Sequence, residues 1–404
     1  SEYTVSNLCS SYGVPYADAD CGEENRSEYC DLLSLERLGD VLRSELEKAQ
    51  MSELYYEIEL PLCEVLASME VTGVMVDCEG IKSFGESLDV DIESLKSEIY
   101  ELAGHEFNIS SPKQLGTVLF EELGLPAGKK TKSGYSTGAE ILEGLANVHP
   151  IINPILEYRT LTKLKSTYVD GLLAVVCPDG RVRSEFKQTE TRTGRISSAN
   201  PNMQNIPVRK EIGSNMRKFF VAAKGRELVD ADYSQIELRV LASMCGDKNM
   251  ISTFLSGTDI HTRTASQVFG VPEELVDADM RRAAKAVNFG IIYGIGAFSL
   301  SKDINVSVAQ ADRYIKSYLA GFPSVDRFMK DTVEFAEKNG YVKTLFGRRR
   351  YIPELKSSNK NLQAFGRRAA MNAPIQGTAA DIIKIAMIRV WRKLKEENLD
   401  ARLI

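Results

Sequence analysis

Two cations and two aromatic residues recur at every fourth position in the second half of the chain. On a helix, Arg281, Lys285, Phe289 and Tyr293 form one stripe about 18 Å long. Guanidinium and ammonium groups bind phosphate oxygens, and aromatic faces stack on bases. The stripe therefore suits a ligand with phosphates at one end and a flat base at the other. The same spacing also fits an amphipathic surface helix whose cations are solvated and whose rings enter the core.

The residues around this stripe predict the helix that must present it. Most residues up to Val287 are good helix formers, and Asp279 lies where the helix dipole favours an acid. Gly294 and Gly296 mark the end of the helix. We therefore expect one helix over residues 279–294.

A second candidate site follows the apolar pair Leu228–Val229, which predicts a buried strand. Ser234 and Glu237 have the spacing of a capping box at the start of an apolar helical run. Asp232 lies between the strand and the helix, where a carboxylate is well placed to hold a divalent ion against phosphates. An Asp before a helix is, however, most often only a cap.

Other stretches predict the elements around these sites. We expect a helix over Leu54–Val71 with a kink or boundary at Pro61, and a second helix over Ile81–Ala103. Ser110 or Ser111 is expected to cap a helix that begins at Pro112. Strand-like alternation over residues 181–186 leads into residues 191–207, a polar segment that predicts a loop or a binding surface.

Composition and charge restrict the class of protein. The 404 residues predict about two to four subdomains, and 43% hydrophobic with 26% charged residues is typical of a globular protein. No run approaches a membrane span and the start is unlike a signal peptide, so we expect a cytoplasmic location. The seven cysteines include no CxxC pair, which argues against a disulfide framework and a zinc site.

The net charge of −6 hides an asymmetry. Residues 1–60 hold 14 acids and 4 bases, so the rest of the chain carries 46 bases against 42 acids. Residues 341–368 contain eight cations and one acid. Because local patches decide phosphate binding, a nucleic-acid partner is compatible with this sequence.

Five motifs together resemble family A DNA polymerases, the group of bacterial DNA polymerase I. They are TGR-x-SS at 193–198, PN-x-QN-x-P at 201–207, DYSQIEL (motif A) at 232–238, DIH-x-x-TA at 259–265 and the motif B pattern at 281–294. The resemblance implies an α+β right-hand polymerase fold, mostly helical, with a thumb, a palm that contains an antiparallel sheet, and fingers. The implied domains are an exonuclease-like remnant at 1–50, the thumb at 51–180, the palm at 181–248 and 361–404, and the fingers at 249–360.

The implied function is template-directed DNA synthesis in replication or repair. This nucleotidyltransferase adds deoxynucleotides to a primer 3′-OH by phosphoryl transfer with two Mg²⁺ ions, for which Mn²⁺ can substitute. The implied partners are primer-template DNA and dNTP, without a membrane, and the chain is expected to be a monomer.

The resemblance also assigns residues to roles. Asp232, Lys285 and Arg281 are implied to be catalytic, and Asp232 with the carbonyl of Tyr233 to hold metal. The implied dNTP-binding residues are Arg281, Lys285, Phe289, Tyr293, His261, Gln235 and Glu237. The implied DNA-binding residues are Arg195, Asn202, Gln204, Asn205, Lys129, Lys130, Lys132, Ser133, Arg368, Asn372 and Gln376.

Two of these roles lead to specific expectations about substrate selection. Glu237 is implied to narrow the pocket beside the sugar and to disfavour a ribose 2′-OH, in competition with its role in the capping box. Phe289, where some relatives have Tyr, is expected to favour deoxy over dideoxy substrates. A single-subunit RNA polymerase shares the Arg/Lys helix, but Glu237 and the DYSQIEL string argue against ribonucleotides.

The sequence departs from the family pattern at both ends. The acidic metal-binding motifs of a 3′–5′ exonuclease are not present, so we expect no proofreading. The family continues beyond a segment like residues 399–404 into a strand with a second catalytic carboxylate. Three explanations remain: a longer enzyme, which we favour, a strand from another polypeptide, or a catalytically impaired fragment that binds primer-template DNA.

Overall fold

The computed structural model describes residues 3–18, 25–127, 134–206 and 215–404. It is mostly helical with small antiparallel sheets, and the residues group into two compact units. The first unit comprises Ser1–Ala67, Gln188–Ile196 and Ala231–Arg402, and the second comprises Ser68–Lys187, Ser197–Asp230 and Leu403–Ile404. The helices are α1 (Val5–Tyr12), α2 (Arg26–Lys48), α3 (Ser52–Leu54), α4 (Leu60–Thr72), α5 (Cys78–Ala103), α6 (Pro112–Thr117), α7 (Ala139–Glu143), α8 (Ile152–Lys163), α9 (Gly171–Leu173), α11 (Ile236–Cys245), α12 (Lys248–Leu255), α13 (Ile260–Phe269), α14 (Ala278–Ile292), α15 (Ala297–Asp303), α16 (Val308–Gly321), α17 (Pro323–Asn339) and α18 (Lys360–Glu396).

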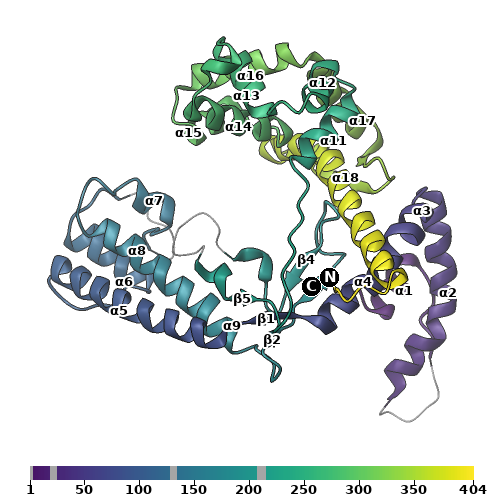
Figure 1. Ribbon diagram of the computed structural model, residues 1–404, viewed down its shortest axis with the longest axis horizontal. Coiled ribbons are helices and arrows are strands. Elements are labelled where there is room, and N and C mark those ends of the chain that lie inside the picture. Colours follow the sequence, from purple (N-terminus) through teal and green to yellow (C-terminus); the bar gives the residue numbers. More distant parts are fainter. Residues whose placement is uncertain (1–2, 19–24, 128–133, 207–214) are drawn as a thin grey trace. The chain divides into compact units, whose positions relative to one another are not determined.

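The second unit combines a small sheet with long helices (Figure 1). Strand β1 (Val74–Val76) pairs antiparallel with β2 (Arg181–Val182) on one side and β5 (Phe220–Val221) on the other. Helix α5 starts directly after β1 because the Asp77 side chain accepts a hydrogen bond from the Gly80 amide at 2.9 Å. The adjacent hairpin pairs β3 (Glu185–Lys187) with β4 (Ser197–Ala199). Strand β4 lies inside the polar segment predicted over residues 191–207, so that segment is not a loop throughout.

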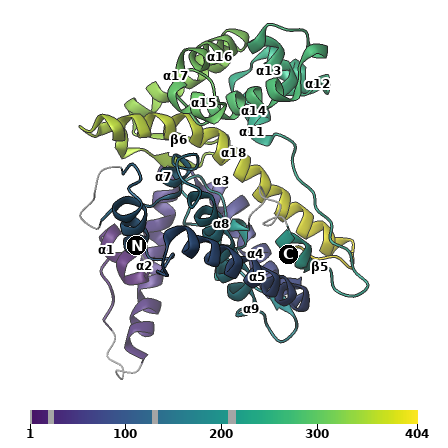
Figure 2. The same cartoon turned by 90° about the vertical axis from the view of Figure 1, so that its left-hand side faces the viewer.

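The first unit is organised around α18. Its largest core cluster joins residues of α11, α14 and α17 to the middle of α18, and both views show these helices against α18 (Figure 1, Figure 2). A hairpin of β6 (Tyr341–Lys343) and β7 (Arg349–Tyr351) precedes α18. This core is the support on which the candidate site is built.

Several predicted elements are confirmed. The predicted boundary at Pro61 coincides with a π-helical turn over Tyr55–Glu59, directly before α4. Proline explains this turn, since it has no N–H to donate and its ring crowds the preceding turn. Ser111, not Ser110, caps α6 by accepting from the Gln114 amide at 3.4 Å. Helix α5 begins three residues earlier than predicted.

The predicted strand at Leu228–Val229 is wrong. Residues 226–233 have no regular secondary structure, and the Val229 side chain is 90% exposed. A strand needs a partner to satisfy its backbone groups, and none of the strands in the described part of the chain pairs with this segment. Apolar residue types alone therefore did not determine its structure.

In the described ranges, no helix combines the length and apolar character that crossing a bilayer requires.

Candidate functional site

Helix α14 presents the stripe of cations and aromatic rings. Its N-cap is Asp277, which accepts from the Met280 amide at 2.7 Å, while Asp279 lies in the first turn as predicted. The opposite face is buried in the core of the first unit through Ala284, Val287 and Ile291. The alternative interpretation, an ordinary amphipathic surface helix, predicted that both rings of the stripe enter the core. Neither ring does so.

The four stripe residues lie outside that buried face. Arg281 and Lys285 are exposed, Phe289 is half-buried, and Tyr293 is 43% exposed just beyond the last helical residue. Gly294 follows with a φ of 64°, a left-handed conformation that ends the helix. The predicted order of two cations followed by two aromatic rings is therefore presented along one accessible edge.

Asp259 anchors the cationic end of the stripe. Its carboxylate accepts from Arg281 Nε at 2.7 Å and also caps α13 by accepting from the Thr262 amide at 3.1 Å. Partial burial by itself raises the pKa of Asp259, but the hydrogen bonds from Arg281 and Thr262 outweigh it and hold the pKa well below its usual range. Arg281 is thus oriented by a carboxylate whose lowered pKa favours the ionised form.

Glu237 joins three separate segments of the first unit. Glu237 on α11 is 6% exposed, and its carboxylate accepts from Arg195 Nη2 at 2.5 Å and from the Tyr293 hydroxyl at 3.2 Å. Burial and the neighbouring Glu237 raise the pKa of Tyr293, so its hydroxyl remains a donor. The arginine of the TGR motif and the last ring of the stripe therefore meet at one carboxylate.

The predicted capping box of α11 is wrong. The N-cap is Gln235, whose φ of 54° is left-handed and whose side chain makes no capping bond. Gln235 Nε2 instead lies 3.4 Å from Asp259 Oδ1. The carboxylate of Glu237 therefore does not serve a helix cap, since it binds Arg195 and Tyr293.

The aromatic end of the stripe borders a cavity of about 520 Å³ within the first unit. Phe289, Tyr293 and Arg368 line it, together with Gly290 and Ser299. The packing is close, because a Cβ on Gly294 would lie 3.1 Å from Arg368 Cγ. Phe289 of α14 and Tyr293, just beyond its end, thus lie next to Arg368 of α18.

Arg368, Asn372 and Gln376 all belong to α18, as predicted. Arg368 is exposed, whereas Asn372 and Gln376 are half-buried. The Nδ2 atom of Asn372 is buried without a hydrogen-bond partner, although a buried donor is normally paired.

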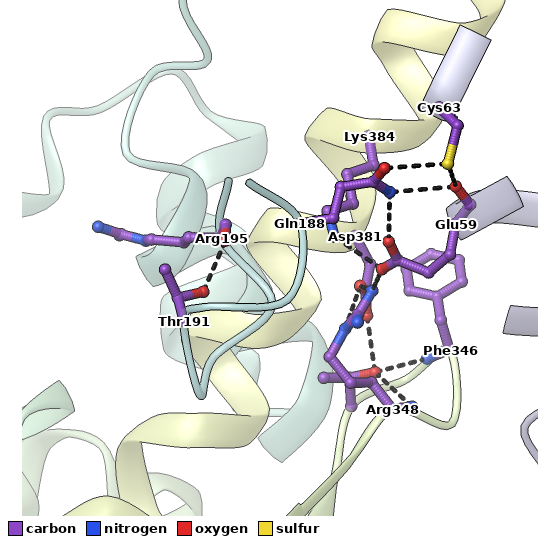
Figure 3. A network of polar contacts seen from close by, with 10 residues as sticks. Glu59, Cys63, Gln188, Thr191, Arg195, Phe346, Arg348, Asp381 and Lys384 are labelled. Atoms are coloured by element: carbon purple, nitrogen blue, oxygen red, sulfur yellow. Dashed lines mark hydrogen bonds and ion pairs between the residues drawn. The ribbon is translucent and has the colours of Figure 1, made fainter. Parts of the chain in front are cut away.

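Two buried charges, Asp381 and Lys384, and two partly buried ones, Arg348 and Glu59, support the TGR loop. The sequence motifs did not single them out. Arg348 donates to Asp381 from Nε at 2.8 Å and also pairs with Glu59, to which Lys384 donates at 2.6 Å (Figure 3). A Cβ on Gly194, the residue before Arg195, would lie 2.5 Å from Arg348 Nε. The network therefore packs directly against the loop that carries Arg195. The signal that the sequence offered was an acid and a base three positions apart, Asp381 and Lys384, within an apolar run.

Asp232 and Tyr233 are both exposed and lie in the irregular segment before α11. Within the described part of the chain, no three His, Cys, Asp or Glu side chains gather in a way that could hold a metal ion. Because a two-ion site needs several acidic ligands, these residues do not fit such a site by themselves.

Three further candidate residues lie in the second unit. Asn202, Gln204 and Asn205 are exposed, and the Asn202 side chain caps a 3₁₀ turn by accepting from the Gln204 amide at 3.0 Å. Lys129, Lys130, Lys132 and Ser133 lie outside the described residues.

His261 is on α13, where its buried ring lies 5.9 Å from the Phe289 ring. Its Nδ1 is 3.0 Å from Nδ2 of Asn288, a fully buried residue of α14 that the motifs did not single out.

Comparisons with known proteins relate this geometry to a family. DNA polymerase I of Bacillus subtilis is 49% identical over 406 residues, which cover 100% of this chain and 46% of that protein. DNA polymerase I of Geobacillus stearothermophilus is 52% identical over 369 residues, covering 91% and 42% of the two chains. This chain thus spans about half the length of these relatives.

A solved structure confirms the right-hand polymerase fold. The POL domain of Pol1 from M. smegmatis, in complex with DNA primer-template and dNTP, matches with a TM-score of 0.90 and 39% identity, over 99% of this chain and 70% of that one. The family model of DNA polymerase family A matches residues 78–404. The protein described by these motifs and this fold therefore belongs to DNA polymerase family A.

Proposed function

We propose that this chain carries out template-directed DNA synthesis, adding deoxynucleotides to a primer 3′-OH. The observation that carries the proposal is the accessible stripe of α14, with Arg281 oriented by Asp259 and Tyr293 bonded to Glu237. Membership of DNA polymerase family A and the DNA primer-template and dNTP bound to the related POL domain support it.

The stripe is proposed to bind the incoming dNTP. Arg281 and Lys285 neutralise the triphosphate, and Phe289 and Tyr293 pack on the sugar and base. Glu237 lies beside the sugar, where a ribose 2′-OH would crowd it, and Lys285 protonates the leaving pyrophosphate. Gln235 and His261 complete the proposed dNTP site.

The DNA-binding assignments are proposals of the same kind. Arg195 checks pair geometry in the minor groove at the primer end, because acceptors there occupy similar positions in every Watson–Crick pair. The exposed amides of Asn202, Gln204 and Asn205 contact the nearby strands, and the α18 face at Arg368, Asn372 and Gln376 binds template and primer. The thumb, palm and fingers boundaries, the monomeric state and the cytoplasmic location stay predictions.

Asp232 and the carbonyl of Tyr233 are proposed to hold Mg²⁺, which would offset phosphate charge when bound. Two ions need carboxylates beyond those that the described residues bring together. For this reason the serious rival function is a primer-template binder that is catalytically impaired.

Primer extension separates the two functions. A labelled primer on a longer template should be elongated with Mg²⁺ and the four dNTPs, and Asp232→Asn should abolish elongation. Asp230→Asn is the matched control, because Asp230 is also exposed and lies two residues away, and it should keep most activity.

Fluorescence anisotropy on the same DNA supplies the second measurement. Tight binding without elongation by the unmodified chain would establish the rival function. Equal use of NTP and dNTP would instead indicate an RNA polymerase.

A further inference from the structure

Asn288 links two helices of the first unit through its side-chain amide. It is fully buried on α14, and its Oδ1 accepts from the Thr264 hydroxyl on α13 at 3.1 Å. Its Nδ2 lies 3.0 Å from Nδ1 of His261, which is one turn before Thr264 on α13. The carbonyl and the NH₂ group of one amide thus both contact α13.

This arrangement determines which imidazole nitrogen carries the proton. The Asn288 carbonyl is occupied by the Thr264 hydroxyl, so the amide group that faces His261 is the donor NH₂. A donor at Nδ2 requires an acceptor at Nδ1, because a protonated Nδ1 would place two N–H groups against each other. The neutral ring therefore carries its proton on Nε2.

The charges around the ring favour the same neutral form. Burial lowers the pKa of His261, and although Asp259 opposes this, the nearby cations Arg281 and Lys285 lower it further. These are the charged groups that face the ring, from the α13 cap and from α14. Burial and the two cations therefore favour the neutral ring over the imidazolium.

We propose that Asn288 is a positioning residue that holds His261 as a neutral Nε2–H donor for the triphosphate, beside Arg281 and Lys285. The inference rests on the proposed function and adds to it. Since Nδ1 is occupied by Asn288, Nε2 is the ring atom left to a ligand. His261 then donates a hydrogen bond to a phosphate oxygen without adding charge, and it neither takes up nor releases a proton during the reaction.

Nitrogen NMR of the histidine rings tests the tautomer directly. Protein with ¹⁵N-labelled histidine has only three ring systems, and His261→Gln identifies the one of interest. We expect one protonated nitrogen, Nε2, and an unprotonated Nδ1 at neutral pH. A proton on Nδ1, an imidazolium ring or a mixture of tautomers would overturn the proposal.

Two substitutions at Thr264 test whether the hydroxyl orients the amide. Thr264→Val removes the donor to Oδ1, so the Asn288 amide is free to turn and the ring should show both tautomers. Thr264→Ser keeps the hydroxyl and should restore the single Nε2–H form. If the valine variant keeps the pure Nε2–H tautomer, Asn288 is not positioned as proposed.

Asn288→Asp replaces the amide donor that faces Nδ1 of His261 by a carboxylate acceptor. A carboxylate accepts from a protonated Nδ1 and favours the imidazolium, so both ring nitrogens should be protonated in this variant near neutral pH. The KM for dNTP, relative to the unmodified chain, should then change about fivefold between roughly pH 6 and 8 as the ring titrates, while kcat changes less. Asn339→Asp, a substitution at an exposed position of α17, is the matched control. Its KM for dNTP, relative to that of the unmodified chain, should not change with pH over this range.

The outcomes separate this inference from the proposed function. An Nδ1–H ring in a chain that extends primers refutes the role of Asn288 alone. An Nε2–H ring in a chain that never extends a primer refutes the proposed function and leaves the tautomer as a structural fact. The NMR spectrum of the unmodified chain decides the tautomer even where a variant fails to fold.

Discussion

At the scale of single residues, the site depends on side chains that satisfy more than one partner. Asp259 both caps α13 and orients Arg281. Glu237 accepts from Arg195 and from Tyr293. Each such carboxylate fixes the position of groups from separate segments, and its substitution should change the chemistry of the site more than the stability of the fold.

Glu237→Ala should relax sugar selection. Removing the buried side chain leaves room where a 2′-OH would lie, and it releases both donors. We expect the ratio of kcat/KM for NTP to that for dNTP to rise about tenfold or more, which corresponds to ~1.4 kcal/mol. Glu237→Gln keeps the volume and is the control. Equal ratios for the alanine variant and the unmodified chain would contradict the proposed role.

Gly194→Ala should disturb the TGR loop. Gly194 has a φ of 82°, and a Cβ there would lie 2.5 Å from Arg348 Nε. Gly246→Ala is the matched control, because its φ of 64° imposes similar backbone strain but nothing lies within 4 Å of the added Cβ. We expect the control to lower the free energy of unfolding by about 1 kcal/mol and Gly194→Ala by more. Equal losses in urea unfolding would exclude the clash.

At the scale of elements, α18 has two functions along its length. One end presents the proposed DNA-binding face, while Asp381 and Lys384 are buried against Arg348 and Glu59 (Figure 3). Such a network ties α18 to the π-helical turn before α4 and to the segment after β6. The helix that carries candidate DNA contacts is therefore held in place by charges outside the site.

Lys384→Met should destabilise the first unit strongly. Lys384 is 1% exposed, and losing it leaves Glu59 with less compensating charge in a buried setting. Breaking a buried ion pair costs about 3–5 kcal/mol. Lys393→Met, on the same helix but 71% exposed, should change the free energy of unfolding by only ~0.5 kcal/mol. Similar losses for the two variants would show that the buried network contributes little.

At the scale of the whole molecule, the distribution of charge matters more than its sum. The net charge is −6, yet residues 341–368 are strongly basic and precede or begin α18. Attraction to DNA phosphates depends on such local patches and weakens as salt rises.

Arg368→Ala should weaken primer-template binding and its dependence on salt. Removing one phosphate contact should reduce the slope of log K against log[salt] by about 1. Arg367→Ala is the matched control, because the neighbouring Arg367 already pairs with Glu337 at 2.7 Å. Anisotropy titrations over a series of KCl concentrations measure both slopes. Identical slopes for Arg368→Ala and the unmodified chain would remove Arg368 from the DNA contact.

The sequence by itself determined the features that depend on neighbours along the chain. The stripe on α14, the turn at Pro61 and the shared face of Arg368, Asn372 and Gln376 follow from helical periodicity and local backbone chemistry. The motifs also identified the family. Local patterns were sufficient here because a helix satisfies its backbone within one segment.

Only the tertiary structure decided which groups meet. Glu237 takes its donors from 42 and 56 positions away, and Lys384 reaches Glu59 across 325 positions. The apolar pair Leu228–Val229 failed as a strand for the same reason, since pairing depends on a distant partner and not on residue type. Contacts of this kind arise when segments that are distant in the sequence pack together, and no spacing along the chain specifies them.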